Sequence, residues 1–170
     1  MKRRTVVASG LAVGAAAAGA GLSWWRSRST AAPLPADFWT LRFERPGGGE
    51  LSFAALKGKP LLLNFWATWC APCVTEMPLI DAFAKRQAGW NVVGLAIDGP
   101  SPVREFLTQR PVTFSIGLAG LTGVDLTRAL GNTAGGLPFT LLLDAMGQPV
   151  QRRLGALKDG ELERWAAALG

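Results

Sequence analysis

Residues 61–73 read Leu-Leu-Leu-Asn-Phe-Trp-Ala-Thr-Trp-Cys-Ala-Pro-Cys, and this stretch decides the fold. Its apolar first part predicts a buried strand, and the residues from Val74 to Arg86 have the pattern of a helix. Cys70 and Cys73, the only cysteines of the chain, therefore lie where a strand passes into a helix. A helix N-terminus carries partial positive charge and free N–H groups, and both stabilise a thiolate. The placement predicts a reactive cysteine pair.

The rest of the chain alternates between strand and helix patterns. Strands are expected at 91–98, 139–144 and 149–154, a short extended piece at 112–116, and an N-terminal hairpin from 38–44 and 50–53. Helices are expected at 101–110, 124–130 and from residue 158 onward. In the first of these, Ser101 would be the cap and Pro102 the first-turn proline. The pattern predicts an α/β fold with helices on both faces of a sheet.

The composition fits one folded domain behind a basic leader. Hydrophobic residues make up 49% of the 170 residues and charged residues 18%, which allows a packed core. Residues 1–30 hold five of the 18 Lys and Arg and no acid, so the remainder carries 13 basic against 12 acidic residues. This distribution argues against a nucleic-acid partner. The chain has no histidine, and two cysteines alone make a poor metal site, so we expect no metal and no cofactor.

Residues 1–30 have the pattern of an export signal or a membrane anchor. A basic start is followed by an uncharged stretch that ends at Trp25, and spanning a bilayer takes about 20 residues. Ala18-Gly19-Ala20 offers a cleavage site, whereas Trp24-Trp25 would suit the interface of a retained anchor. Both alternatives stay open, and either places the protein in the periplasm or on the outer face of the inner membrane. Residues 31–37 are expected to be a tether and residues 38–170 the folded domain.

Two motifs carry a family resemblance. The run from Asn64 to Cys73, followed by Glu76-Met77-Pro78, resembles the signature of the TlpA/ResA group of thioredoxin-like proteins. Gly135-Gly136-Leu137-Pro138-Phe139-Thr140 resembles the loop that carries the cis-proline of the thioredoxin fold. The resemblance covers roughly residues 38 to 169. It implies a central mixed sheet flanked by helices on both faces, with an extra N-terminal β-hairpin.

Members of this group are membrane-anchored or periplasmic thiol-disulfide oxidoreductases. Several of them reduce apocytochrome c or similar extracytoplasmic cysteines, and a membrane electron carrier recharges them. By resemblance we expect an enzyme that reduces disulfides of cysteine-containing exported proteins and takes electrons from a membrane donor of the thiol-reductase type.

The cysteine motif and the cis-proline loop receive specific roles. Cys70, at the start of the helix, would attack the substrate disulfide, and Cys73, about one turn deeper, would resolve the mixed disulfide. Ala71 and Pro72 form the active-site loop between them. Pro138 would dock substrate in an extended form beside Cys70. Leu137 would present its backbone to the substrate.

Glu76 is the expected proton carrier. It lies one helical turn beyond Cys73, and it could accept and return the thiol proton if burial raises its pKa. The alternative is an exposed surface charge. Thioredoxin itself has a buried aspartate where this chain has Asn64, which makes Glu76 the best substitute. Trp66 is expected in the core, and Trp69 is expected to cover the disulfide from its exposed side and to contact substrate.

Other functions stay open on the same residues. A disulfide oxidant or isomerase would share this fold, because the direction of electron flow depends on the reduction potential. A redoxin-type thiol peroxidase needs a Thr-x-x-Cys site, whereas Thr68 stands two residues before Cys70. A copper-handling protein of similar fold would use a distant histidine, and the chain has none.

Overall fold

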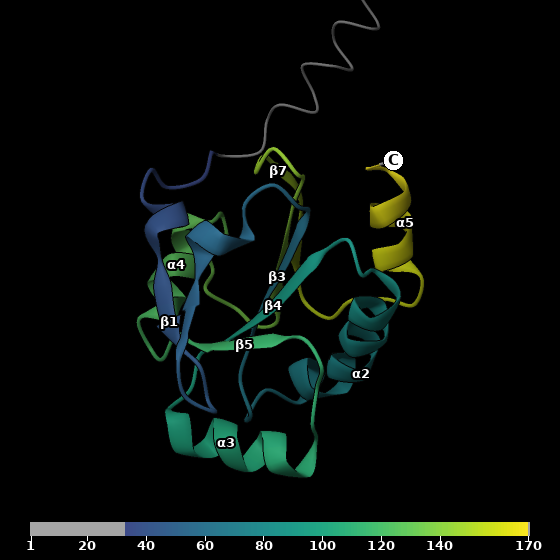
Figure 1. Ribbon diagram of the computed structural model, residues 1–170. Coiled ribbons are helices and arrows are strands. Elements are labelled where there is room, and N and C mark those ends of the chain that lie inside the picture. Colours follow the sequence, from purple (N-terminus) through teal and green to yellow (C-terminus); the bar gives the residue numbers. More distant parts are fainter. Residues whose placement is uncertain (1–32, 170) are drawn as a thin grey trace, which may run out of the picture. The chain divides into compact units, whose positions relative to one another are not determined.

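A seven-stranded mixed sheet organises the computed structural model, which describes residues 33–169 (Figure 1). The predicted leader, residues 1–30, lies outside this range. Within the described part of the chain, no helix is both long and apolar enough to span a bilayer.

Three parallel strands form the centre of the sheet and antiparallel strands flank them. The strand order is β2-β1-β5-β4-β3-β6-β7. The parallel strands are β3 (Leu61–Trp66), β4 (Asn91–Ala96) and β5 (Ser115–Leu118). The flanking strands are β1 (Arg42–Glu44) and β2 (Glu50–Ser52), which pair as an N-terminal hairpin, and β6 (Phe139–Leu143) and β7 (Pro149–Leu154). The expected mixed sheet is confirmed.

Helices cover both faces of the sheet (Figure 1). One hydrophobic cluster lies beneath α2 (Ala71–Arg86), α3 (Pro100–Gln109) and α5 (Glu161–Ala167). The opposite cluster lies beneath α4 (Gly123–Ala129) and two 3₁₀ turns, η1 (Phe38–Thr40) and η2 (Phe53–Leu56). Successive side chains of β3 alternate between the two clusters, as strand geometry requires. Leu62 and Trp66 face α2, so Asn64 between them faces α2 as well.

One edge of the sheet brings the two sequence motifs together. Cys70 follows the carboxyl end of β3, and Pro138 precedes the start of the antiparallel strand β6. In the register of these strands, Phe65 lies opposite Phe139. The cysteine pair and the proline loop, which are far apart in sequence, are therefore neighbours in the fold.

The expected strand at 38–44 is wrong in its first half. Phe38–Thr40 form a 3₁₀ turn, and only Arg42–Glu44 are extended. The turn closes because the Thr40 N–H and hydroxyl both donate to the Asp37 carbonyl, at 2.8 and 2.7 Å. It places Phe38 wholly inside the core, 5.1 Å from the ring of Phe53. Burial of one large aromatic ring outweighs the alternating pattern.

The start of α3 also differs from the prediction. The helix begins at Pro100 with Gly99 as its cap, so Ser101 is not the cap. Pro100 suits the first helical position because its missing N–H would have no helical partner there.

The strand β5 begins later than the extended piece expected at 112–116. It starts at Ser115 rather than Val112 because Thr113, two residues earlier, is bonded to a helix. The Thr113 N–H and hydroxyl donate to Asp81 Oδ1 of α2, at 2.6 and 2.7 Å. Asp81 also pairs with Lys85, at 2.6 Å. This carboxylate fixes the segment to α2 and withdraws its backbone from the sheet.

Candidate active site

Cys70 and Cys73 form a disulfide at the N-terminus of α2, and their Cα atoms are 5.3 Å apart. Cys70 is the N-cap residue, and its Sγ accepts a hydrogen bond from the Cys73 N–H at 3.3 Å. Pro72 lies in the first turn, where its missing N–H costs no helical bond. After reduction, a thiolate at Cys70 would face this N–H and the positive end of the helix.

The two sulfurs are not equally accessible. Cys70 is 7% exposed and Cys73 is 1% exposed. Cys70 is therefore the more accessible of the two, although both residues belong to the hydrophobic cluster beneath α2. This difference supports Cys70 as the attacking cysteine and Cys73 as the resolving one.

Asp98 fixes the turn that leads into the cysteine motif. Its Oδ2 accepts hydrogen bonds from the Thr68 N–H at 2.7 Å and from the Thr68 hydroxyl at 2.8 Å. The Thr68 hydroxyl is thus bonded to Asp98 and not to the cysteine that follows. Sequence reasoning gave Asp98 no role. Asp98 could have been identified as an acidic residue just beyond β4, because β4 runs parallel to β3 and both strands end on the same side of the sheet.

Glu76 is a buried carboxyl group, 4% exposed, and not the surface charge of the alternative interpretation. Its Oε1 accepts from Asn64 Nδ2 at 2.8 Å, and its Oε2 accepts from the Leu157 N–H at 2.7 Å. Burial raises the pKa of Glu76, and these two hydrogen bonds oppose the rise. The expected condition for a proton carrier, partial burial with a raised pKa, is therefore present.

Cys73 and Glu76 lie three residues apart on α2. Residues at this spacing are neighbours on a helix surface, about 5–6 Å apart at Cβ. Both side chains are buried, so Cys73 has a carboxyl group with a raised pKa one turn away. Such a group can take the thiol proton and later return it.

Asn64 can serve both protonation states of Glu76. It is fully buried, and its Nδ2 donates to Glu76 Oε1 and to Thr140 Oγ1, at 2.8 and 3.0 Å. Its Oδ1 has no hydrogen-bond partner among residues 33–169. When Glu76 is protonated, a half-turn of the amide would let Oδ1 accept from Glu76 and from the Thr140 hydroxyl, and would move Nδ2 to the position where Oδ1 now has no partner. An aspartate at this position could not offer the two alternatives while ionised.

The proline loop has the geometry expected from its sequence. The Leu137–Pro138 peptide bond is cis. Pro138 is buried, and Leu137 is half-buried and packs against the cluster that contains both cysteines. Asn132 Nδ2 supports the loop by donating to the Gly136 carbonyl at 2.8 Å. The Pro138 carbonyl accepts from the Gly155 N–H at 2.9 Å. Sequence reasoning missed both supports.

The two tryptophans near the motif have opposite environments. Trp66 is fully buried and packs against Phe106, with ring centroids 5.1 Å apart, which confirms its expected place in the core. Trp69 is 68% exposed and is the residue directly before Cys70. It presents a large aromatic surface beside the disulfide. Contact between Trp69 and substrate stays a prediction.

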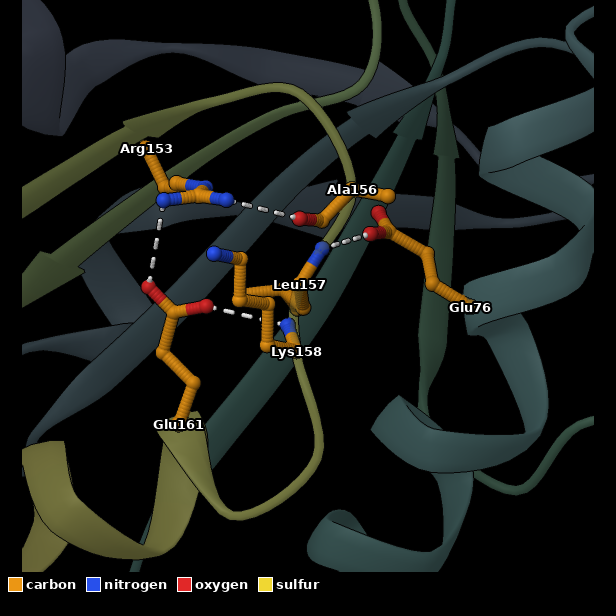
Figure 2. A network of polar contacts seen from close by, with 6 residues as sticks. All are labelled: Glu76, Arg153, Ala156, Leu157, Lys158 and Glu161. Carbon is orange, nitrogen blue, oxygen red and sulfur yellow. Dashed lines mark hydrogen bonds and ion pairs between the residues drawn. The ribbon is translucent and has the colours of Figure 1, made fainter.

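Leu157 contributes through its backbone, so its side chain gave no signal in the sequence. It lies in the segment between β7 and α5, 81 residues from Glu76. Figure 2 shows this segment facing the Glu76 carboxylate, with Arg153 and Glu161 on its other side.

Comparisons with known proteins agree with the geometry. The profile of the family described as Redoxin matches residues 34–169. The chain is 30% identical to the thiol-disulfide oxidoreductase ResA of Bacillus cereus over 119 residues, which is 68% of this chain and 66% of that protein, just under two thirds of its length. It is 32% identical to the thioredoxin-like protein YneN of Bacillus subtilis, over 69% of each chain. A thiol:disulfide interchange protein of Chlorobium tepidum superposes with a TM-score of 0.68 at 29% identity, over 81% of this chain and 97% of that one.

Proposed function

The chain belongs to the redoxin family, in its ResA/TlpA-like group of thiol-disulfide oxidoreductases, and from this premise we propose that it reduces disulfides of exported proteins outside the cytoplasm. The observation that carries the proposal is the Cys70–Cys73 disulfide at the start of α2 with the buried Glu76 one turn beyond it. No other arrangement of reactive groups in residues 33–169 combines an accessible sulfur with a carboxyl group of raised pKa.

The cycle follows from these positions. The Cys70 thiolate attacks one sulfur of the substrate disulfide, and the other substrate sulfur leaves and takes a proton. Glu76 accepts the proton of Cys73, whose thiolate then attacks Cys70 Sγ and releases the second substrate sulfur. The substrate gains two electrons and two protons, and the Cys70–Cys73 disulfide forms. Solvent access to Cys70 and burial of Cys73 support this order.

The substrate is proposed to be an extended segment of an exported protein that carries a cysteine pair, such as that of apocytochrome c. Leu137 and Pro138 would supply the backbone against which the segment docks, and Trp69 an exposed aromatic surface beside Cys70. A loop that binds substrate through backbone contacts and one aromatic face accepts many substrate sequences, which suits a reductase with several substrates.

We place the protein in the periplasm or on the outer face of the inner membrane. The support is the leader pattern of residues 1–30, which would be either a cleaved signal or a retained anchor. The oxidised dithiol would be recharged by a membrane donor of the thiol-reductase type. The relatives are thiol-disulfide oxidoreductases, a class that includes both directions of electron flow, so an oxidant or isomerase is the competing function. A thiol peroxidase has less support, because the nearby Thr68 hydroxyl is bonded to Asp98.

Stoichiometric electron transfer tests the proposal. The reduced protein is mixed with a synthetic peptide that carries a Cys-x-x-Cys disulfide, and free thiols are counted by mass after alkylation. We expect one equivalent of protein to reduce nearly one equivalent of peptide, while protein alkylated beforehand at its cysteines reduces none. If instead the oxidised protein converts the reduced peptide to its disulfide nearly completely, the protein is an oxidant.

A further inference from the structure

The segment between β7 and α5 joins the two halves of the site. Its first residue, Gly155, donates its N–H to the Pro138 carbonyl at 2.9 Å. Two residues later, the Leu157 N–H donates to Glu76 Oε2 at 2.7 Å. One short stretch of backbone thus bonds both the proline loop and the buried carboxyl group.

Side chains from the elements on both sides of this segment bind its backbone. Arg153 at the end of β7 donates from Nη2 to the Ala156 carbonyl at 3.3 Å. Glu161 at the start of α5 accepts the Lys158 N–H on Oε2 at 2.9 Å. The two side chains form an ion pair, with Arg153 Nη1 3.7 Å from Glu161 Oε1. Their contacts fall on the residues directly before and after Leu157, as Figure 2 shows.

We propose that the Arg153–Glu161 pair is a positioning clamp that holds the Leu157 N–H on Glu76 and thereby keeps the ionised form of Glu76 available to Cys73. The inference rests on the proposed reductase function, in which Glu76 carries the Cys73 proton. Arg153 and Glu161 touch neither sulfur, so they act through the segment and not on the reacting atoms.

The segment needs such a clamp because of its own sequence. Gly155 and Gly160 bound it, and both have left-handed backbone angles, with φ of +91° and +70°. Glycine has many accessible backbone conformations at these two positions, so contacts from side chains are needed to hold the segment in one conformation. The clamp is partly shielded from water, since the Arg153 side chain is 32% and the Glu161 side chain 12% exposed. Arg153 Nε is moreover buried without a hydrogen-bond partner among residues 33–169, which costs free energy.

The charges that face Glu76 come from several elements. Arg153 on β7 lowers the pKa of Glu76, and Glu161 on α5 raises it, while burial remains the largest influence. Asn64 on β3 donates to it, Thr140 on β6 bonds Asn64 from behind, and Cys73 lies on the same helix. These two opposite charges hold the segment and act on Glu76 in opposite directions, and the N–H that they position stabilises the carboxylate.

Carbon-13 NMR of the Glu76 carboxyl carbon tests the clamp in the full chain. The protein is kept oxidised, so the cysteines do not titrate, and Glu76→Gln identifies the signal. Arg153→Met removes the positive charge and the hydrogen bond to the Ala156 carbonyl together. Both losses disfavour the carboxylate, so we expect the pKa of Glu76 to rise above its wild-type value.

Arg86→Met is the matched control. It removes one arginine whose side-chain partner is Glu163, also on α5, and not a residue of the segment. We expect the Glu76 titration in this variant to match wild type. An equal shift in both variants, or none in Arg153→Met, would overturn the proposal.

Arg153→Lys separates position from charge, and it also replaces Arg153→Met if that variant does not fold. Lysine keeps the charge but lacks the planar fork that reaches Ala156 and Glu161 together. We expect the pKa of Glu76 to rise in this variant too. A pKa of Glu76 equal to wild type in Arg153→Lys would mean that only the charge of Arg153 matters, and it would overturn the proposed clamp. Because the titration involves no redox partner, this result is independent of the peptide-reduction experiment.

Discussion

Replacing Cys70 with serine is expected to abolish disulfide reduction, whereas replacing Cys73 with serine is expected to trap the substrate. Cys70 is the more exposed sulfur and caps α2, so its loss removes the attacking thiolate. The rate should fall by at least about 10³-fold, as when other enzymes lose their nucleophile. In Cys73→Ser the attack still occurs, but the mixed disulfide has no resolving thiol and accumulates.

Mass spectrometry after mixing with the Cys-x-x-Cys peptide measures both outcomes. The expected adduct is one peptide joined through Cys70 in Cys73→Ser, and no adduct in Cys70→Ser. Both variants should remain folded, because a disulfide that closes so small a loop constrains the unfolded chain little. An adduct in Cys70→Ser with none in Cys73→Ser would reverse the two roles. Unchanged reduction by either variant would remove the dithiol cycle altogether.

Glu76→Gln is expected to have the second-largest effect on turnover. Loss of a positioned acid-base group typically costs about 10²–10⁴-fold, and we expect the resolution step to slow by about 10²-fold. The limb of the pH profile that reports Glu76 should disappear with it. Glutamine is nearly isosteric with glutamate: its carbonyl can accept from the Leu157 N–H, and its NH₂ can donate to Asn64 Oδ1 if the Asn64 amide turns. The change therefore removes a proton carrier and not the packing.

The same variant should change how stability depends on pH. Because burial raises the pKa of Glu76, the folded protein binds this proton more tightly than the unfolded chain does. Wild-type stability is therefore reduced as the pH rises from the unfolded value, about 4.3, through the folded one. Glutamine does not ionise and does not lose stability in this way. The free energy of unfolding of Glu76→Gln minus that of wild type should therefore increase as the pH rises from 4 to 8.

Urea unfolding of the oxidised proteins at several pH values measures this difference. Glu105→Gln, on the exposed side of α3, is the matched control and should follow wild type at every pH. A constant offset between Glu76→Gln and wild type across the range would show that Glu76 has no raised pKa. A single-turnover resolution rate equal to wild type would remove Glu76 from the cycle.

The sequence determines the centre of the fold because local and long-range requirements agree there. The apolar run of β3, the cysteine motif and the helix pattern after it all predict one arrangement, and the structure contains it. The cis bond before Pro138 was likewise expected from its motif. The prediction of secondary structure was wrong at two places where a tertiary contact overrides the local sequence pattern. Phe38 enters the core through a tight turn, and Asp81 withdraws Thr113 from the sheet.

The surroundings of the site were harder to predict for a physical reason. Glu76 could be identified because a carboxyl group near a thiol has an obvious use. Its second donor is the backbone N–H of Leu157, and any residue other than proline could supply it. Asp98 and Arg153 act through backbone groups of other segments, so only the fold brings them to the site.

The reduction potential of the Cys70–Cys73 pair tests the central claim most directly. It is measured by equilibrating the full chain with glutathione buffers at pH 7 and following the fluorescence of its tryptophans. A reductase that a membrane donor recharges should have a potential at or below about −220 mV. A value near −120 mV would contradict the account and identify the protein as an oxidant that introduces disulfides.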